Sequence, residues 1–156
     1  MKVHHIVIDD TNPEHLALSI CRTGKINRVR LGDNAYTTYG TIGIDAHDYA
    51  ALFHYGIVEA LNRLPFISET GNGLDSWDEA FLSNSSIWGM LNILETCAST
   101  IDTEAKERIL LGWQDQPVGV AYLRDIDPAK FLTFLGELGT FLEESAAEGY
   151  DLEFLL

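Results

Sequence analysis

A strongly amphipathic helix is predicted for residues 127–149, and this segment constrains the fold most. Asp127 and Pro128 are a typical helix start, because the aspartate caps free backbone N–H groups and a proline at the first helical position has no N–H to lose. Gly149 is suited to end the helix in the left-handed conformation. The apolar positions recur on one stripe, which consists of Phe131, Leu135, Leu138 and Leu142. Such a helix must bury its stripe against a second layer of secondary structure.

Three other regions have the apolar pattern of β-strands. Residues 150–156 alternate, so the chain is expected to finish as a strand whose inward side chains are Tyr150, Leu152, Phe154 and Leu156. Residues 107–124 contain two apolar runs joined by residues 114–117. Because both faces of each run are nearly all apolar, we expect two central strands there. Residues 3–8 are predicted to form the first strand.

The segment after the first strand is predicted to begin with a short helix. Asn12 and Pro13 suit its start and Gly24 its end, and its buried face would consist of Leu16, Ala17, Ile20 and Cys21. Residues 25–31 and 35–44 are then expected to form a β-hairpin around the turn signal at residues 32–34.

Three more helix signals follow. Asp45 is expected to cap a helix that runs to about Leu64, with a stripe made of Tyr49, Phe53, Ile57, Ala60, Leu61 and Leu64. Residues 76–79 form a capping box that predicts another helix start. The last pattern predicts a helix whose stripe holds Ile87, Met90, Leu91, Leu94 and Ala98. Together the elements predict one α+β domain over residues 1–156, in which three to four helices pack on a largely antiparallel sheet.

Charge is the strongest feature of the composition. The 156 residues include 24 acids and 10 bases, so the formal net charge is −14. Residues 1–63 carry six bases and seven acids, whereas residues 64–156 carry four bases and 17 acids. A field of this sign repels nucleic acids and anionic membranes and attracts basic proteins.

The sequence also predicts the compartment. Cys21 and Cys97 lie in separate apolar patterns, which favours reduced thiols over a disulfide. No apolar run approaches the roughly 20 residues that span a bilayer, and the first apolar run is too short for a secretion signal. We therefore expect a cytoplasmic protein without a membrane segment.

No complete catalytic or metal-binding set can be found in the sequence. His4 and His5 are neighbours on a strand and point to opposite faces, while His47 and His54 are about two turns apart on one helix. Asp9 and Asp10 end the first strand, where a phosphate-handling enzyme would hold Mg²⁺, but no glycine-rich loop follows. The sequence thus predicts no catalytic residue, no metal site and no cofactor.

The run of residues 64–105 contains no Lys or Arg and carries the candidate binding residues. These are the acids and tryptophans Glu69, Asp75, Trp77, Asp78, Glu79 and Trp88. Clustered carboxylates attract a cationic partner, and tryptophan is enriched among the residues that dominate binding energy. We therefore predict that this region binds a basic protein.

In its whole profile the chain resembles the immunity proteins of bacterial polymorphic and contact-dependent growth inhibition toxin systems. The resemblance rests on the base-free stretch around "GNGLDSWDEAF" and on the acidic ending that starts at "DPAKFLTFLGELG". It implies a protein that neutralises a cognate toxin domain, commonly a basic nuclease, by covering its active site or substrate groove. Two alternatives stay open: a small enzyme with a site assembled from Asp9, Asp10, His47 and His54, and an adaptor subunit of a stable complex.

Overall fold

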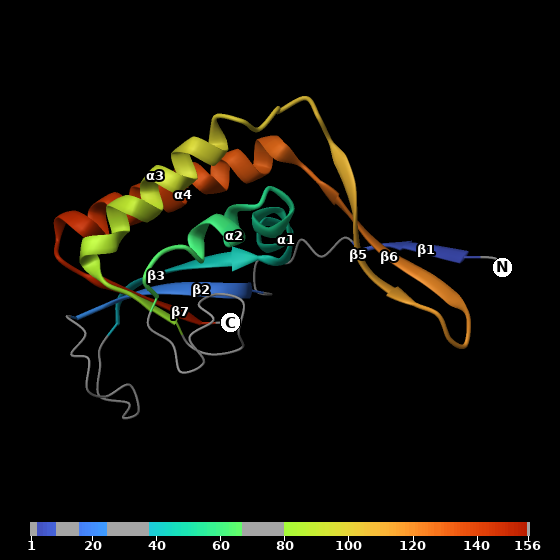
Figure 1. The fold of residues 1–156 in the computed structure, drawn as a ribbon, viewed down its shortest axis with the longest axis horizontal. Coiled ribbons are helices and arrows are strands. Elements are labelled where there is room, and N and C mark those ends of the chain that lie inside the picture. Colours follow the sequence, from blue (N-terminus) through green and yellow to red (C-terminus); the bar gives the residue numbers. More distant parts are fainter. Residues whose placement is uncertain (1–2, 9–15, 25–37, 67–79, 156) are drawn as a thin grey trace.

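The computed structural model describes residues 3–8, 16–24, 38–66 and 80–155. These residues form two β-sheets and a layer of helices (Figure 1), which confirms the α+β class. The strands are β1 Val3–Val7, β2 Leu16–Thr23, β3 Thr38–Asp45, β4 Ala80–Leu82, β5 Glu107–Gln114, β6 Gly119–Ile126 and β7 Asp151–Leu155. The helices are α1 Ala46–His54, α2 Ile57–Leu61, the 3-10 turn η2 Asn84–Ser86, α3 Ile87–Ala98 and α4 Pro128–Ala147.

The larger sheet has the strand order β3-β2-β7-β4, and all its neighbouring strands are antiparallel. The helices cover one face of it (Figure 1). The register places Ile42, Ile20, Phe154 and Ala80 in one cross-strand row. Ile20, Phe154 and Ala80 are buried and belong to the main hydrophobic core. The prediction that the end of the chain is a core strand is therefore confirmed for Leu152 and Phe154, whereas Tyr150 precedes the strand and Leu156 lies outside the described residues.

The α4 helix packs over this sheet as the sequence predicts. Asp127 caps it through hydrogen bonds from the backbone N–H groups of Ala129 and Lys130, and all four residues of the predicted stripe are buried. Arg22 of β2 lies against the other end of α4, where its guanidinium stacks on Phe141 at 4.3 Å and donates to Ser145 Oγ at 2.7 Å. This arginine ties the last turns of α4 to the sheet.

Residues 46–61 form two helices where the sequence predicts one. Asp45 caps α1 as expected, with its carboxylate accepting from the N–H of Asp48 at 2.8 Å. The chain then turns at Gly56, whose φ of 74° lies in the left-handed region that side chains rarely adopt. The buried face of α1 consists of His47, Asp48, Ala51 and Leu52, so Phe53 of the predicted stripe is exposed instead of buried.

Two predicted helices are wrong. Residues 16–23 form the strand β2, because their alternating residues Leu18 and Ile20 are buried and their backbone pairs with β3 on one side and β7 on the other.

The capping box at residues 76–79 lies outside the described residues, as does the predicted hairpin turn at residues 32–34. The residues that would continue a helix from that box form β4.

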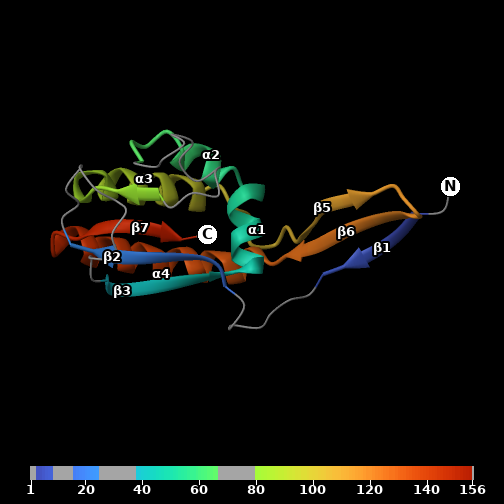
Figure 2. The ribbon, with the colours of Figure 1, turned by 90° about the horizontal axis from the view of Figure 1, so that it is seen from below.

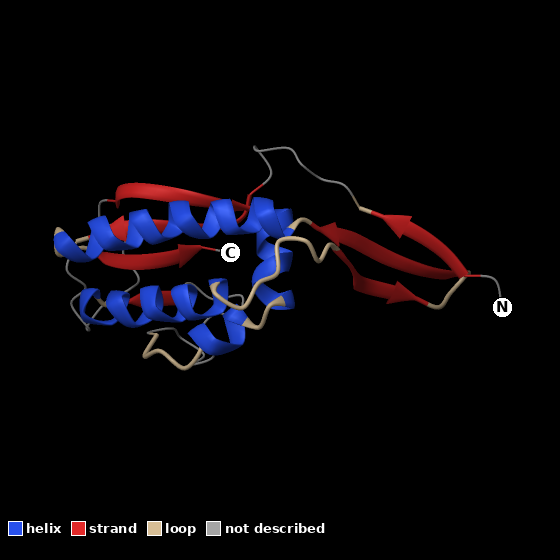
Figure 3. Ribbon diagram, turned by 90° about the horizontal axis from the view of Figure 1, so that it is seen from above, coloured by secondary structure: helices blue, strands red, loops and turns tan. Residues whose placement is uncertain are grey.

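The smaller sheet has the order β1-β6-β5 and extends away from the rest of the molecule as an arm (Figures 2 and 3). In the arm, β1 and β6 are parallel and β5 and β6 are antiparallel. The prediction of one sheet is therefore wrong, and so is the prediction that β5 is a central strand. It is an edge strand of the arm, with Leu110, Leu111 and Trp113 exposed.

Candidate functional site

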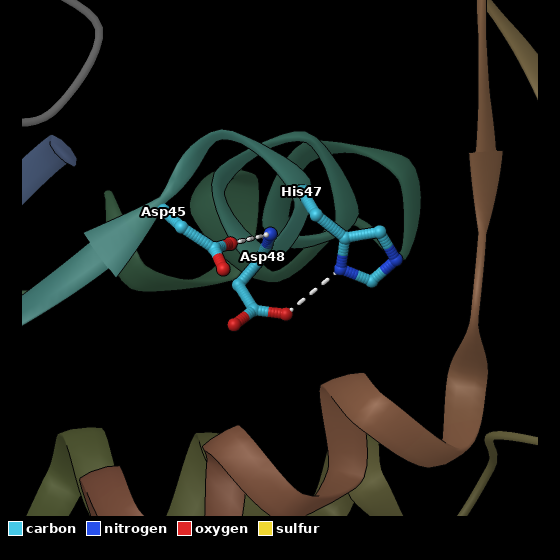
Figure 4. Close-up of side chains that lie close together, drawn as sticks. All are labelled: Asp45, His47 and Asp48. Atoms are coloured by element: carbon cyan, nitrogen blue, oxygen red, sulfur yellow. Dashed lines mark hydrogen bonds and ion pairs between the residues drawn. The ribbon is translucent and has the colours of Figure 1, made fainter. Parts of the chain in front are cut away.

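Three potential metal ligands meet at the start of α1 (Figure 4). Asp45, His47 and Asp48 each place one ligand atom within 4.8 Å of the others. His47 and Asp48 are buried, and the structure shows no other such group among its described residues. The sequence offers these residue types but does not reveal the cluster, since the side chains converge only in the folded helix turn.

Hydrogen bonds to the protein already use both ring nitrogens of His47. The backbone N–H of Asp127 donates to His47 Nε2 at 2.9 Å, so this nitrogen carries no proton. In the neutral ring the proton then lies on Nδ1, which donates to Asp48 Oδ1 at 2.9 Å. His47 therefore joins the start of α1 to the start of α4 and has no free lone pair for a metal.

An ammonium group already holds the two carboxylates. Lys130 Nζ lies 2.9 Å from Asp45 Oδ2 and 3.1 Å from Asp48 Oδ2. The lysine charge thus stands where a cation would neutralise the two aspartates. These contacts fit a structural link between the starts of α1 and α4 better than a metal centre. We call the four side chains of Asp45, His47, Asp48 and Lys130 the clamp.

The clamp predicts a pH-dependent stability. Burial opposes ionisation of Asp45, but the Asp48 N–H and the Lys130 ammonium together hold its pKa below the usual range. Asp45→Asn keeps a side chain that can cap α1 and loses only the charge, so we expect it to lower the free energy of unfolding at neutral pH by about 1 kcal/mol. The pKa of Asp45 is lower in the folded state than in the unfolded state. The parent is therefore more stable than Asp45→Asn by the full amount above about pH 4, and this difference is lost as the pH falls through the folded-state pKa.

Thermal melts of both proteins across the acid range measure this prediction. Asp125→Asn is the control, because Asp125 forms an exposed ion pair with Arg108 in the arm and should change stability less. A difference between parent and Asp45→Asn that stays constant down to pH 2 would contradict the clamp.

The residues of the enzyme alternative do not form one site in the described structure. His47 is held in the clamp near the start of α1, whereas His54 is the last residue of that helix and bonds to Glu107 of the arm. Asp9 and Asp10 lie outside the described residues. Burial and the charges of Glu107 and Asp127 raise the pKa of Tyr55, so its hydroxyl stays protonated at neutral pH.

Of the predicted partner-binding residues, the structure places only Trp88. Glu69, Asp75, Trp77, Asp78 and Glu79 lie outside the described residues. Trp88 is in the first turn of α3 and is 56% exposed, which makes it one of the most exposed large apolar side chains of the described structure. It is available for contact with another molecule.

A groove of about 300 Å³ lies between α3 and α4. Its apolar lining consists of Leu91, Leu94 and Ala98 on α3 and Leu132, Leu135, Gly136 and Gly139 on α4. Glu95 and Glu143 also line it, one from each helix. The groove therefore combines an apolar floor with carboxylates from both sides.

Trp88 belongs to the same side of α3 as this groove. It precedes Leu91 by three residues and Glu95 by seven, and these spacings place side chains on one helix face. The sequence of α3 contains no base, and the one base of α4 is Lys130, which is paired with Asp45 and Asp48. The two helices therefore contribute no unpaired base beside the groove, and Arg22 of β2 pairs with Glu144 in the last turns of α4.

A second, open cleft of about 640 Å³ lies between α1 and the arm. Phe53 and Tyr49 line it from α1, and Ile109 and the buried Arg124 line it from the arm. His54 at its margin is engaged by Glu107. Its described lining residues do not include a nucleophile with an adjacent base.

Comparison of the chain with protein-family models, with curated proteins and with solved structures gives no match. Among the described residues, no helix has both the length and the apolar character needed to cross a membrane. What the protein does must therefore be argued from its surfaces.

Proposed function

We propose that this protein binds a basic protein domain through the groove between α3 and α4, and that the partner is a toxin domain which it neutralises in the cytoplasm of the producing cell. The observation that carries the proposal is the apolar groove with a glutamate from each helix and an exposed tryptophan on the same side. The toxin assignment follows the resemblance to immunity proteins; the groove supports the basic character of the partner.

The groove indicates what the partner must offer. Two adjacent helices with an apolar groove between them accept an amphipathic segment, whose apolar side chains fill the groove. Glu95 and Glu143 would then meet Lys or Arg residues that flank those side chains. Trp88 would add a large apolar contact at the end of the groove where α3 begins.

A kinetic experiment tests the proposal with the purified product of the adjacent gene, which the proposal expects to contain the toxin domain. We expect the double variant Glu95→Gln with Glu143→Gln to slow association about 10-fold at low salt, because acidic residues steer a cationic partner. Trp88→Ala should mainly speed dissociation, by about 30-fold, which corresponds to about 2 kcal/mol. Association should also slow as salt is added.

The matched control carries Glu59→Gln and Glu104→Gln. Both glutamates are exposed, neither lines the groove, and the pair changes the net charge by the same amount. If the control and the groove variant slow association equally, the effect is one of net charge and the groove is not the interface. Absence of binding to the toxin domain, with the parent shown to be folded, would contradict the proposed function itself.

A further inference from the structure

The cleft between α1 and the arm contains a buried arginine without a partner. Arg124 of β6 is only 5% exposed, and it lines the cleft. No residue in the described part of the chain accepts a hydrogen bond from its guanidinium or pairs with its charge. Arginine is rarely buried to this extent unless it is paired, because a charge away from water is costly. The guanidinium is therefore a strong donor that the described protein leaves unused.

The register of the arm sets the direction of this side chain. Arg124 pairs with Ile109 of β5, and Glu107 lies in the next row on the same face. This face is turned toward α1, which stands where the arm joins the rest of the molecule (Figure 2). The carboxylate of Glu107 bonds to His54 at the end of α1. The acid that shares a face with Arg124 is thus already engaged, and the arginine is not.

The walls around Arg124 are mostly apolar. Ala50 and Phe53 line the cleft from α1, and Ile109 and Leu111 line it from β5. Phe53 is 47% exposed and Leu111 41%, so an apolar molecule in the cleft would cover both. Sites for small molecules combine apolar walls with a few polar groups that fix the orientation of the ligand. The cleft has this character, and its polar group carries a positive charge.

We propose that this cleft binds a small organic acid, whose single carboxylate bonds to Arg124 and whose apolar body lies between α1 and β5. A guanidinium matches a planar carboxylate, because two parallel N–H groups meet its two oxygens. A phosphate group carries more than one negative charge, which exceeds the single charge of Arg124 in a chain of net charge −14. A small hydrophilic acid such as acetate would leave the apolar walls exposed to water.

The site does not depend on the proposed function. The cleft and the groove between α3 and α4 share no lining residue. They also attract opposite charges, since Arg124 suits an anion whereas Glu95 and Glu143 suit a cation. Loss of toxin binding would therefore leave the binding of the organic acid intact, and the reverse also holds.

Isothermal titration of the full chain with octanoate tests the proposal. We expect a dissociation constant on the order of 100 µM, which is an ordinary affinity for a ligand of this size. Octanamide has the same shape without the charge, and it should bind about 30-fold more weakly because it lacks charge-assisted hydrogen bonds to Arg124. Inorganic phosphate at the same concentration should not displace octanoate.

Arg124→Met keeps the apolar stem of the side chain and removes the charge. It should weaken octanoate binding about 30-fold and leave octanamide binding unchanged, because only the carboxylate uses the guanidinium. Arg108→Met is the matched control, since Arg108 is an exposed arginine of the same arm that is paired with Asp125. It changes the net charge by the same amount and should leave octanoate binding as it is in the parent.

Thermal melts show that each variant is folded, and they add a second test. Because Arg124 is buried without a partner, Arg124→Met should melt at a higher temperature than the parent. Octanoate should raise the melting temperature of the parent and of Arg108→Met, but not that of Arg124→Met. A lower melting temperature of Arg124→Met would mean that the protein itself pairs the arginine, and it would overturn the proposal. Three other results would also overturn it: a parent that binds octanoate no better than octanamide, full octanoate binding in Arg124→Met, and displacement of octanoate by phosphate.

Discussion

A chain that lacks residues 150–156 is expected to be unfolded at room temperature. β7 lies between β2 and β4, so its removal takes backbone pairing from both neighbours and leaves β4 without the strand it pairs with. It also removes the buried side chains of Leu152 and Phe154, and burial of each contributes about 1.5 to 3 kcal/mol. These losses together approach the 5 to 15 kcal/mol that stabilise a typical domain.

Circular dichroism and a thermal melt of the truncated chain measure this effect. Leu155→Ala is the control, because Leu155 is only partly buried at the end of β7 and its truncation leaves the strand in place. This variant should melt cooperatively at a slightly lower temperature. A truncated chain that melts like the parent would show that β7 is dispensable.

The central position of β7 illustrates what the sequence can predict. The alternation of Leu152 and Phe154 is local, so the strand is visible in the sequence. The register and the neighbours of the strand are not local, because β2 and β7 are separated by more than a hundred residues of chain. For this reason the sequence predicts an end strand but not its place in the middle of the larger sheet.

The misassignment of β2 has the same origin. Leu16, Ala17, Ile20 and Cys21 have the spacing of a helix face. Leu18 and Ile20 also have the spacing of a strand, and short apolar runs do not distinguish the two structures. Pairing with β3 and β7 on both sides decides for the strand, and neither partner can be identified from the local sequence.

The arm shows a different limit of the sequence. Residues 107–124 are apolar on both faces, which is the usual pattern of strands covered on both sides. The strands form as predicted, but Leu110 stays 60% exposed and Trp113 49% exposed in the described structure. An apolar pattern indicates that a strand face is suited to being covered. It does not indicate whether the group that covers it belongs to the same chain.

The candidate groove could be predicted only in part. The base-free character of α3 can be read from the sequence, and the structure shows that the candidate binding residue Trp88 is exposed. The pairing of α3 with α4 does not follow, since the strands β5 and β6 separate the two helices in the chain. The glycines at 136 and 139 were the available signal, because small residues on a helix keep a groove open beside its neighbour.

Asn84, just before α3, joins the two helices through contacts that local patterns do not reveal. Its side-chain amide donates to the carbonyls of Ser145 at 3.3 Å and Ala146 at 3.2 Å, and to that of Tyr150 at 2.9 Å. Its backbone N–H donates to Asp151 Oδ1 at 2.7 Å. The carbonyls of Ser145 and Ala146 also accept the backbone N–H groups of Tyr150 and Gly149, so the Asn84 amide adds a second donor to each of them at the end of α4.

Asn84→Asp is expected to lower the free energy of unfolding by about 2 kcal/mol, because the amide loses its two N–H donors, which three carbonyls share and which are worth about 1 kcal/mol each. The variant also places a negative charge at the negative end of the α4 dipole and near Asp151. Both surroundings disfavour the charged form, which raises the pKa of the introduced carboxyl above its unfolded value near 3.9. The folded state then binds more protons than the unfolded state, so the destabilisation is complete at neutral pH and shrinks as the pH falls through the raised pKa.

Urea unfolding at neutral and acidic pH measures both parts of the Asn84 prediction. Ser85→Asp is the matched control, since Ser85 is the exposed next residue and the substitution adds the same charge without removing a bond to α4. We expect the control to change stability by less than about 0.5 kcal/mol. Equal effects of the two substitutions would mean that added charge, and not the lost contacts with α4, causes the destabilisation. A penalty in Asn84→Asp that does not diminish at acidic pH would mean that the introduced carboxyl lies away from the α4 carbonyls, because only a charged group facing them loses its penalty on protonation.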